Sequence, residues 1–213
     1  MALVFAAAPL AATARMTARL AEFDWPYVVA ADGGAASALA FGFQPDVVVG
    51  DLDSIDARVL AELRRRGVAI ETHPRDKDAT DGQLAIERAL RTQPASVWLL
   101  GFLGGPRLDQ ALAHVLFLAR VGTRAVMLDE HNEITLLQPG TSLAWPPEPN
   151  EVVSLIPLTA EVLGIQTHGL RWPLTGERLQ LGDTRGVSNE PNAPEARVSI
   201  ERGKLLITRH FPG

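Results

Sequence analysis

The stretch Val47-Val48-Val49-Gly50-Asp51-Leu52-Asp53-Ser54 decides the fold class of this chain. Three β-branched residues in a row, with no polar residue between them, are typical of a strand that is buried on both faces. Such strands belong to parallel sheets whose two faces are covered by helices. The apolar run passes through a glycine directly into two aspartates and a serine. The segment therefore predicts a central strand with polar groups at its carboxyl end.

The same pattern recurs on both sides of this strand, within the first 130 residues. Nearly continuous apolar runs predict strands at Leu3–Ala8, Tyr27–Ala31, Asp46–Gly50, Val68–Glu71, Val97–Gly101 and Ala125–Asp129. The segments between them predict helices at Met16–Phe23, Ala35–Phe41, Asp56–Arg66, Asp81–Arg91 and Arg107–Val121. This alternation indicates an α/β domain with a mainly parallel sheet.

The character of the chain changes after Asp129, where nine of the fifteen prolines lie. Short strands are predicted at Ile134–Leu137, Val152–Leu155, Val162–Thr167, Leu179–Leu181, Arg197–Ile200 and Leu205–Thr208. Turn residues separate them, which is typical of an antiparallel all-β domain, either a sandwich or a barrel. We therefore expect two domains, covering residues 1–135 and 136–213.

The composition is that of a globular protein, with 213 residues of which 46% are hydrophobic and 21% are charged. The absence of cysteine excludes disulfides, thiolate catalysis and cysteine-based zinc sites. A net charge of −5 argues against a nucleic-acid partner, and no apolar run is long enough to span a membrane. Arg15 follows the apolar N-terminal stretch instead of preceding it, so we expect no signal peptide and a cytoplasmic chain.

Aspartates cluster where the predicted strands end, which is where open α/β sheets bind their ligands. Asp51 and Asp53 would point the same way from an extended segment, while Leu52 turned back toward the core. Two carboxylates on one face suit a hard cation such as Mg²⁺, which prefers one or two carboxylates together with substrate phosphates. Alternatively, Asp53 or Ser54 only caps the helix that follows.

The segment Thr80-Asp81-Gly82-Gln83 fits a capping box, with threonine at the N-cap and glutamine at the third helical position. Asp81 would lie in the first helical turn, where the helix dipole favours a negative charge. Lys77 and Asp78 precede the helix, in a loop that could meet a phosphate.

Three further features are weaker when taken singly. The turn Asp32-Gly33-Gly34 would let backbone N–H groups approach a nucleotide, although ordinary turns use the same residues. Arg107 suits a phosphate, although an arginine at a helix start usually lies at the surface. His114 interrupts an apolar helix, which favours a buried supporting residue.

Together these motifs are much more specific. Their order is Ala31-Asp32-Gly33-Gly34-Ala35, Pro45-Asp46, Gly50-Asp51-Leu52-Asp53-Ser54, Lys77-Asp78-Ala79-Thr80-Asp81 and Gly104-Gly105-Pro106-Arg107-Leu108-Asp109. In this order they resemble the thiamine pyrophosphokinase family. The resemblance continues through Val153–Leu158, Gly169–Leu174 and Arg185–Glu190, and it covers nearly the whole chain.

The resemblance implies an α/β nucleotide-binding catalytic domain followed by a β-sandwich that binds thiamine. It also implies a homodimer with active sites between the subunits. The reaction would transfer the pyrophosphoryl group of ATP to the hydroxyl of thiamine, with Mg²⁺ as cofactor, and release AMP. Phosphoryl transfer depends on positioning and charge neutralisation, so the absence of a covalent nucleophile fits this chemistry.

Carried over to this sequence, the resemblance implies a role for each matching residue. Mg²⁺ and the phosphates would be held by Asp51, Asp53 and Asp81. The reacting groups would be flanked by Lys77, Asp78 and Thr80. ATP or thiamine would be placed by Asp32, Gly33, Gly34, Arg107 and Asp109. Thiamine would be contacted by Ser188 and Asn189.

The chain also departs from the family pattern. Pro106 is inserted between the glycine pair and Arg107, and His114 replaces a usual asparagine. Ile207 stands where some members stack a tryptophan on thiamine, so it would offer thiamine an aliphatic contact. Alternatively, Ile207 is an ordinary core residue of the last strand, because alternation places it on the same face as Leu205.

Three other functions remain open at this point. One is a pyrophosphokinase for a related alcohol such as a pterin, which would keep the same metal site. Another is a phosphatase in which Asp51 is phosphorylated, but that chemistry needs a later lysine, and lysine is nearly absent here. The third is a non-catalytic module that senses a nucleotide or thiamine.

Overall fold

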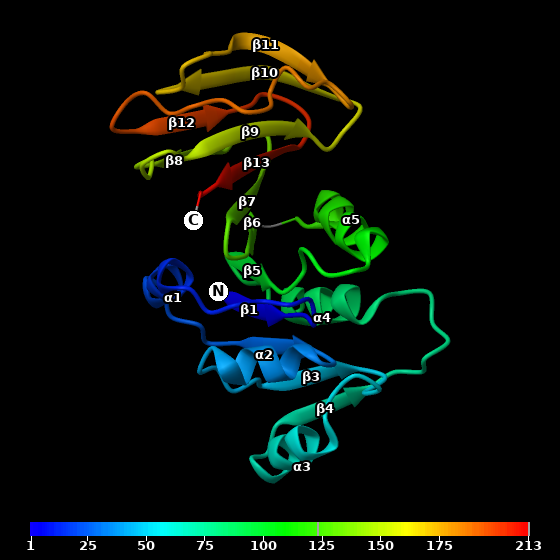
Figure 1. Cartoon of the computed structure of the whole chain (residues 1–213). Coiled ribbons are helices and arrows are strands. Elements are labelled where there is room, and N and C mark those ends of the chain that lie inside the picture. The colour runs from blue at the N-terminus through cyan, green and yellow to red at the C-terminus, as the bar shows by residue number, and fades with distance from the viewer. Residues whose placement is uncertain (123, 213) are drawn as a thin grey trace. The chain divides into compact units, whose positions relative to one another are not determined.

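The computed structural model describes residues 1–122 and 124–212, which form two compact units (Figure 1). The first unit comprises residues 1–117 and 121–130, and the second comprises residues 118–120 and the chain from His131 onward. The boundary expected between residues 135 and 136 lies inside strand β7 (Asn132–Leu137). Within the described residues, no helix combines the length and the apolar character that a membrane span requires.

Six strands of the first unit form a parallel sheet in the order β4-β3-β2-β1-β5-β6. The strands are β1 (Ala2–Phe5), β2 (Val28–Ala31), β3 (Val47–Gly50), β4 (Ala69–Thr72), β5 (Ser96–Leu100) and β6 (Arg124–Leu128). Every residue of β1, β2, β3 and β5 is buried, whereas β4 lies at the edge and is partly exposed. The predicted α/β fold with a mainly parallel sheet is confirmed.

Helices connect these strands, as predicted, with small shifts at their ends. They are α1 (Ala14–Ala21), α2 (Gly34–Ala40), α3 (Ala57–Arg65), α4 (Asp81–Leu90) and α5 (Leu108–Phe117). The helix predicted over Arg107–Val121 is too long, because the chain tightens after Phe117 into a 3₁₀ turn at Leu118–Arg120.

The first strand is shorter than its apolar sequence suggests. It ends at Phe5 and not at Ala8, although the N–H groups of Ala6 and Ala8 still donate to the carbonyls of Leu100 and Gly101. The backbone therefore stays close to the end of β5 beyond the strand. This irregular stretch borders the cavity described below.

The second unit contains two antiparallel sheets (Figure 1). One has the order β7-β13-β9, with β13 at Leu205–His210 and β9 at Val152–Pro157. The other has the order β11-β10-β12-β8, with strands at Thr175–Gln180, Glu161–His168, Ala196–Ser199 and Ser142–Trp145. Buried side chains from both sheets share one apolar cluster, so the predicted β-sandwich is confirmed.

The sequence did not predict strand β8. It has four residues, lies at the edge of its sheet, and alternates in burial along Ser142-Leu143-Ala144-Trp145. Only two of its four residues, Leu143 and Trp145, are large and apolar, so its apolar signal is weak, and two prolines follow it directly.

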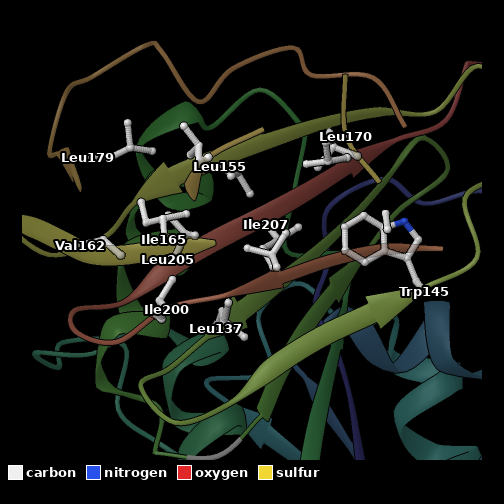
Figure 2. Packing of buried hydrophobic residues seen from close by; sticks show 14 residues of the cluster. Leu137, Trp145, Leu155, Val162, Ile165, Leu170, Leu179, Ile200, Leu205 and Ile207 are labelled. Carbon is white, nitrogen blue, oxygen red and sulfur yellow. The ribbon is translucent and has the colours of Figure 1, made fainter. Parts of the chain in front are cut away.

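Ile207 lies within the core of the second unit (Figure 2). Its exposed fraction is 0%, and it belongs to the same buried cluster as Leu137, Trp145 and Leu205. The expectation that Ile207 offers thiamine an aliphatic contact is therefore wrong, and the alternative of a core residue is confirmed. Alternation along β13 places Leu205 and Ile207 on the inner face, as the pattern indicated.

Replacing Ile207 by Trp should lower the free energy of unfolding by about 1–3 kcal/mol, because an indole overfills a closely packed core. Thermal melts of Ile207→Trp and of His210→Trp, at an exposed position of the same strand, provide the comparison. The second substitution should leave the melting temperature nearly unchanged. An unchanged melt for Ile207→Trp, with tighter thiamine binding, would contradict the core assignment.

Candidate active site

A cavity of about 530 Å³ opens in the first unit, where the parallel strands end. Its walls come from the loops after β1, β2, β3, β4 and β5, from the start of α4, and from one side of α5. Ligands bind to open α/β sheets at this edge. The predicted site residues among its lining are Asp32, Asp51, Asp53, Lys77, Thr80, Asp81 and Arg107.

Three carboxylates meet on one side of this cavity. One oxygen each from Asp32, Asp51 and Asp53 lies within 4.8 Å of the others. Asp32 is buried, Asp51 is partly buried and Asp53 is exposed. Carboxylate oxygens at such separations can share a divalent cation.

Asp32 supplies the strongest sign that the trio suits a cation. Its Oδ2 accepts a hydrogen bond of 3.1 Å from the N–H of Ser54, whereas its Oδ1 is buried without a hydrogen-bond partner among the described residues. A buried carboxylate oxygen that lacks a partner is costly unless a cation or another donor satisfies it. Burial raises the pKa of Asp32, and the nearby Asp51 and Asp53 raise it further.

The sequence grouped Asp51 and Asp53 correctly but for the wrong geometric reason. The segment is not extended, because Leu52 has a φ of +65°. This left-handed residue packs its side chain on the core, as expected, and both aspartates remain at the cavity. The next helix, α3, is capped by Asp56, whose carboxylate accepts the N–H groups of Arg58 and Val59. The alternative that Asp53 or Ser54 caps this helix is therefore wrong.

Lys77 lies between two of the acidic side chains. Its Nζ is 3.6 Å from Asp51 Oδ2 and 3.2 Å from Asp81 Oδ1. Desolvation opposes the ionisation of Asp51, but the N–H of Asp53 and the Lys77 ammonium together lower its pKa. Asp81 thus lines the cavity beside the carboxylate trio and is bound to Lys77. Asp78 is exposed and does not line the cavity.

The start of α4 is fixed by Thr80, as predicted. Its Oγ1 accepts a hydrogen bond of 3.0 Å from the N–H of Gln83. The Gln83 side chain donates instead to Glu87, one turn further along, so the reciprocal half of the capping box is not formed. This cap sets the position of the first helical turn, in which Asp81 lies.

Gly33 and Gly34 lie at the start of α2 and do not line the cavity. A Cβ on Gly34 would lie 2.4 Å from the carbonyl oxygen of Phe5, so this glycine lets α2 pack directly on the backbone of β1. A Cβ on Gly33 would meet Ala7 and Ser54 at 3.3 Å. Gly34 thus serves close packing, which is a different role from the expected backbone approach to a nucleotide.

Gly34→Ala should lower the free energy of unfolding by about 1–3 kcal/mol, since its methyl group would force apart two backbone segments. Gly33→Ala is the matched control, and we expect a smaller loss because its neighbours need to move only slightly. Denaturant unfolding of the two variants measures the difference. If both variants lost the same free energy of unfolding, the close contact with Phe5 would not be the reason that residue 34 must be glycine.

Arg107 lines the cavity, but its side chain is paired with Asp109, two residues further along the chain. Its guanidinium donates to both carboxylate oxygens of Asp109, at 2.9 and 2.6 Å. Both side chains are exposed, and hydrogen bonding with Arg107 lowers the pKa of Asp109 to about 2. The loop before them turns at Gly104 and Gly105, which have φ values of +74° and +76°. Arg107 would have to leave Asp109 to bind a phosphate.

The two predicted thiamine contacts, Ser188 and Asn189, lie in the second unit. Ser188 is exposed, has a φ of +61°, and donates its N–H to Ser154 Oγ. The amide of Asn189 accepts the N–H groups of Trp172 and Glu190 and donates to the carbonyl of Trp172. The side chain of Asn189 therefore holds the loop around Trp172 in place, a role that the sequence did not indicate.

His114 is a cavity residue that the site prediction did not include. It is buried on α5, and its Nε2 lies 3.3 Å from Thr80 Oγ1. Its ring packs edge-on against Phe102, with centroids 5.0 Å apart. Burial lowers the pKa of His114. The sequence signal was present, because a histidine inside an apolar helix predicts a buried supporting role.

Two family models match this chain. Residues 22–128 match "Thiamin pyrophosphokinase, catalytic domain", and residues 141–205 match "Thiamin pyrophosphokinase, vitamin B1 binding domain". The two matched ranges fall largely on the α/β unit and the β unit respectively.

Relatives and solved structures agree with these matches. The chain is 27% identical to the thiamine pyrophosphokinase of Bacillus subtilis over 184 residues, covering 85% of this chain and 86% of that protein. It is 29% identical to thiamine pyrophosphokinase 1 of Oryza sativa subsp. japonica, covering 75% of this chain and 64% of the rice protein.

Among solved structures, the Bacillus subtilis thiamine pyrophosphokinase superposes with a TM-score of 0.85 at 24% identity, covering 99% of each chain. The thiamin pyrophosphokinase of Geobacillus thermodenitrificans gives 0.80 at 25% identity, covering 99% of this chain and 97% of that one. The matched family models, together with this shared fold, show that the chain belongs to the thiamin pyrophosphokinase family.

Proposed function

We propose that this protein transfers the pyrophosphoryl group of ATP to the hydroxyl of thiamine, which gives thiamine diphosphate and AMP. The observation that carries the proposal is the carboxylate trio of Asp32, Asp51 and Asp53, at the carboxyl edge of the sheet of a chain that both family models match. The named relatives are thiamine pyrophosphokinases from bacteria and plants, which supports ATP and thiamine as the substrates.

The trio fits Mg²⁺, since it offers hard oxygen ligands and includes the unpaired buried Oδ1 of Asp32. We propose Asp32, Asp51 and Asp53 as its ligands, with Asp81 beside them. When bound, the cation would neutralise charge on the phosphates of ATP.

Lys77 would contribute a further positive charge to the same region. Its ammonium lies within 4 Å of both Asp51 and Asp81, and its side chain is only 14% exposed. An ammonium held in this way can attract the charged oxygens of a transferring group without a large rearrangement. Thr80 and Asp81, at the start of α4, would then line the space in which the hydroxyl of thiamine meets ATP.

The acidic cavity also suits the second substrate. Thiamine carries a fixed positive charge on its thiazolium ring, and a mouth lined with carboxylates attracts cations. Ser188, which is exposed at a left-handed turn of the β unit, would provide a contact to thiamine from the second unit. We further propose a cytoplasmic enzyme.

An assay of product formation tests which acceptor the protein uses. Thiamine diphosphate is converted to its fluorescent thiochrome derivative and detected by chromatography. We expect product only when protein, ATP, Mg²⁺ and thiamine are all present. A hydroxymethyl pterin offered in equal amount should give no product. Pyrophosphorylation of the pterin but not of thiamine would favour the alternative acceptor, and the absence of any product would favour a non-catalytic module.

We also propose a homodimer in which each active site uses both subunits. The trio lies in the α/β unit and Ser188 in the β unit, so the two sets can come from different chains. An inactive Asp51→Asn protein and a Ser188→Lys protein, which places a cation at the thiamine contact, should regain activity when mixed and allowed to exchange subunits. No recovery, despite exchange proven by differently tagged chains, would contradict a shared site.

A further inference from the structure

His114 has a defined relation to the first turn of α4. Its Nε2 lies 3.3 Å from Thr80 Oγ1, and both residues line the cavity. Thr80 Oγ1 already accepts the N–H of Gln83, so its own hydrogen is available to donate. A neutral imidazole can accept that hydrogen at Nε2, and burial favours the neutral form.

The surroundings of His114 leave its ring little freedom. Phe102 packs against one side, with ring planes inclined at 76°. On another side lies Gly82, where a Cβ would come within 2.6 Å of His114 Nε2 and 3.1 Å of Cε1. The ring therefore rests directly on the first turn of α4, and the absence of a side chain at residue 82 makes room for it.

We propose that His114 is a positioning residue, which fixes the hydroxyl of Thr80 and through it the first turn of α4, where Asp81 lies. Asp81 follows Thr80 in the chain and is held by Lys77 at the cavity. If the cap loosens, the carboxylate of Asp81 moves relative to the trio. His114 thus acts on the reaction through Thr80 and need not touch either substrate.

Hydrogen exchange of the Gln83 amide tests the proposal without substrates or metal. In His114→Phe, which keeps an aromatic ring but lacks Nε2, we expect this amide to exchange roughly fivefold faster, as for the loss of one neutral hydrogen bond. Val115→Ala is the control, since it alters the adjacent, partly buried position of the same helix. An unchanged Gln83 amide in His114→Phe, or equal acceleration in Val115→Ala, would overturn the proposal.

A double-mutant cycle on turnover tests the route through Thr80. We expect His114→Phe and Thr80→Val each to lower kcat by about tenfold, because small displacements of catalytic groups are costly. The double variant should be no slower than the slower single variant. If the loss in kcat of the double variant equalled the product of the two single losses, His114 would act independently of Thr80, and the proposal would be overturned.

A second variant covers the case in which His114→Phe does not fold. Gly82→Ala should push the imidazole away from Thr80 and accelerate exchange at Gln83 in the same way, and normal exchange there would overturn the proposal. The inference depends on the proposed function only in the turnover cycle. Faster exchange in a protein whose wild type forms no thiamine diphosphate would uphold the role of His114 and reject the function.

Discussion

Asp51→Asn should abolish metal-dependent formation of thiamine diphosphate while leaving the fold intact. Asp51 lies in the carboxylate trio and 3.6 Å from the ammonium of Lys77, so its loss removes a proposed metal ligand and leaves Lys77 with one partner fewer at the site. We expect the loss of a charged group that acts in the transition state to lower turnover by about 10³-fold or more. Steady-state kinetics over a range of Mg²⁺ concentrations measures the loss.

The matched control is Asp56→Asn. Asp56 caps α3, and asparagine is an equally good N-cap, so this variant should keep nearly all of the turnover. Circular dichroism and thermal melts of both variants should match the wild type. If Asp51→Asn retained a tenth of wild-type turnover, the assignment of Asp51 to the metal would be wrong.

Arg209→Met should destabilise the β unit severely. Arg209 is 7% exposed, and it donates to both oxygens of Glu151 and to Glu133, which are each 2% exposed. Glu151 also accepts from the indole of Trp145 and the N–H of Glu148. Removing the arginine breaks its two hydrogen bonds to the buried carboxylate of Glu151, and breaking a buried ion pair costs about 3–5 kcal/mol.

Arg197→Met provides the comparison, because Arg197 pairs with Glu195 in an exposed ion pair. An exposed pair contributes about 0–1 kcal/mol, so this control should unfold almost like the wild type. Denaturant unfolding of both variants gives the two free energies. Similar small losses for Arg197→Met and Arg209→Met would show that water reaches the buried cluster.

The fold was predictable because its signals are local. Continuous runs such as Val47–Val49 are buried on both faces, and the alternation of runs with helical segments leaves few topologies besides a parallel sheet. The proline-rich part, with its closely spaced strands, was equally readable as an antiparallel domain. Strand β8 was not predicted, because four residues at the edge of a sheet need little hydrophobicity and give a weak signal.

The sequence predicted several of the residues that line the cavity, but it did not predict how they are arranged. Strand order brings the loops after β2 and β3 together, since Ala31 pairs with Val49, and this places Asp32 against Asp51 and Asp53. The pairing of β2 with β3 is a long-range contact, which the local sequence does not show. The spacing of residues along the chain could indicate only the Asp51–Asp53 pair. The left-handed turn at Leu52 was equally invisible, because leucine rarely adopts this conformation.

Roles that depend on distant contacts could not be predicted from sequence. Gly34 faces the backbone of β1, far away in the chain, and Asn189 uses its amide on the loop of Trp172. Ile207 belongs to a core that forms only when the two sheets meet. In each case the residue type allowed two roles, and packing decided between them.

Identification of the nucleotide product tests the central claim most directly. The wild-type protein is incubated with ATP and Mg²⁺, with and without thiamine, and AMP and ADP are separated by ion-exchange chromatography. We expect AMP in amounts equal to the thiamine diphosphate formed, and almost no AMP without thiamine. Release of ADP in step with phosphorylated thiamine would contradict pyrophosphoryl transfer, and nucleotide hydrolysis that does not depend on thiamine would contradict thiamine as the acceptor.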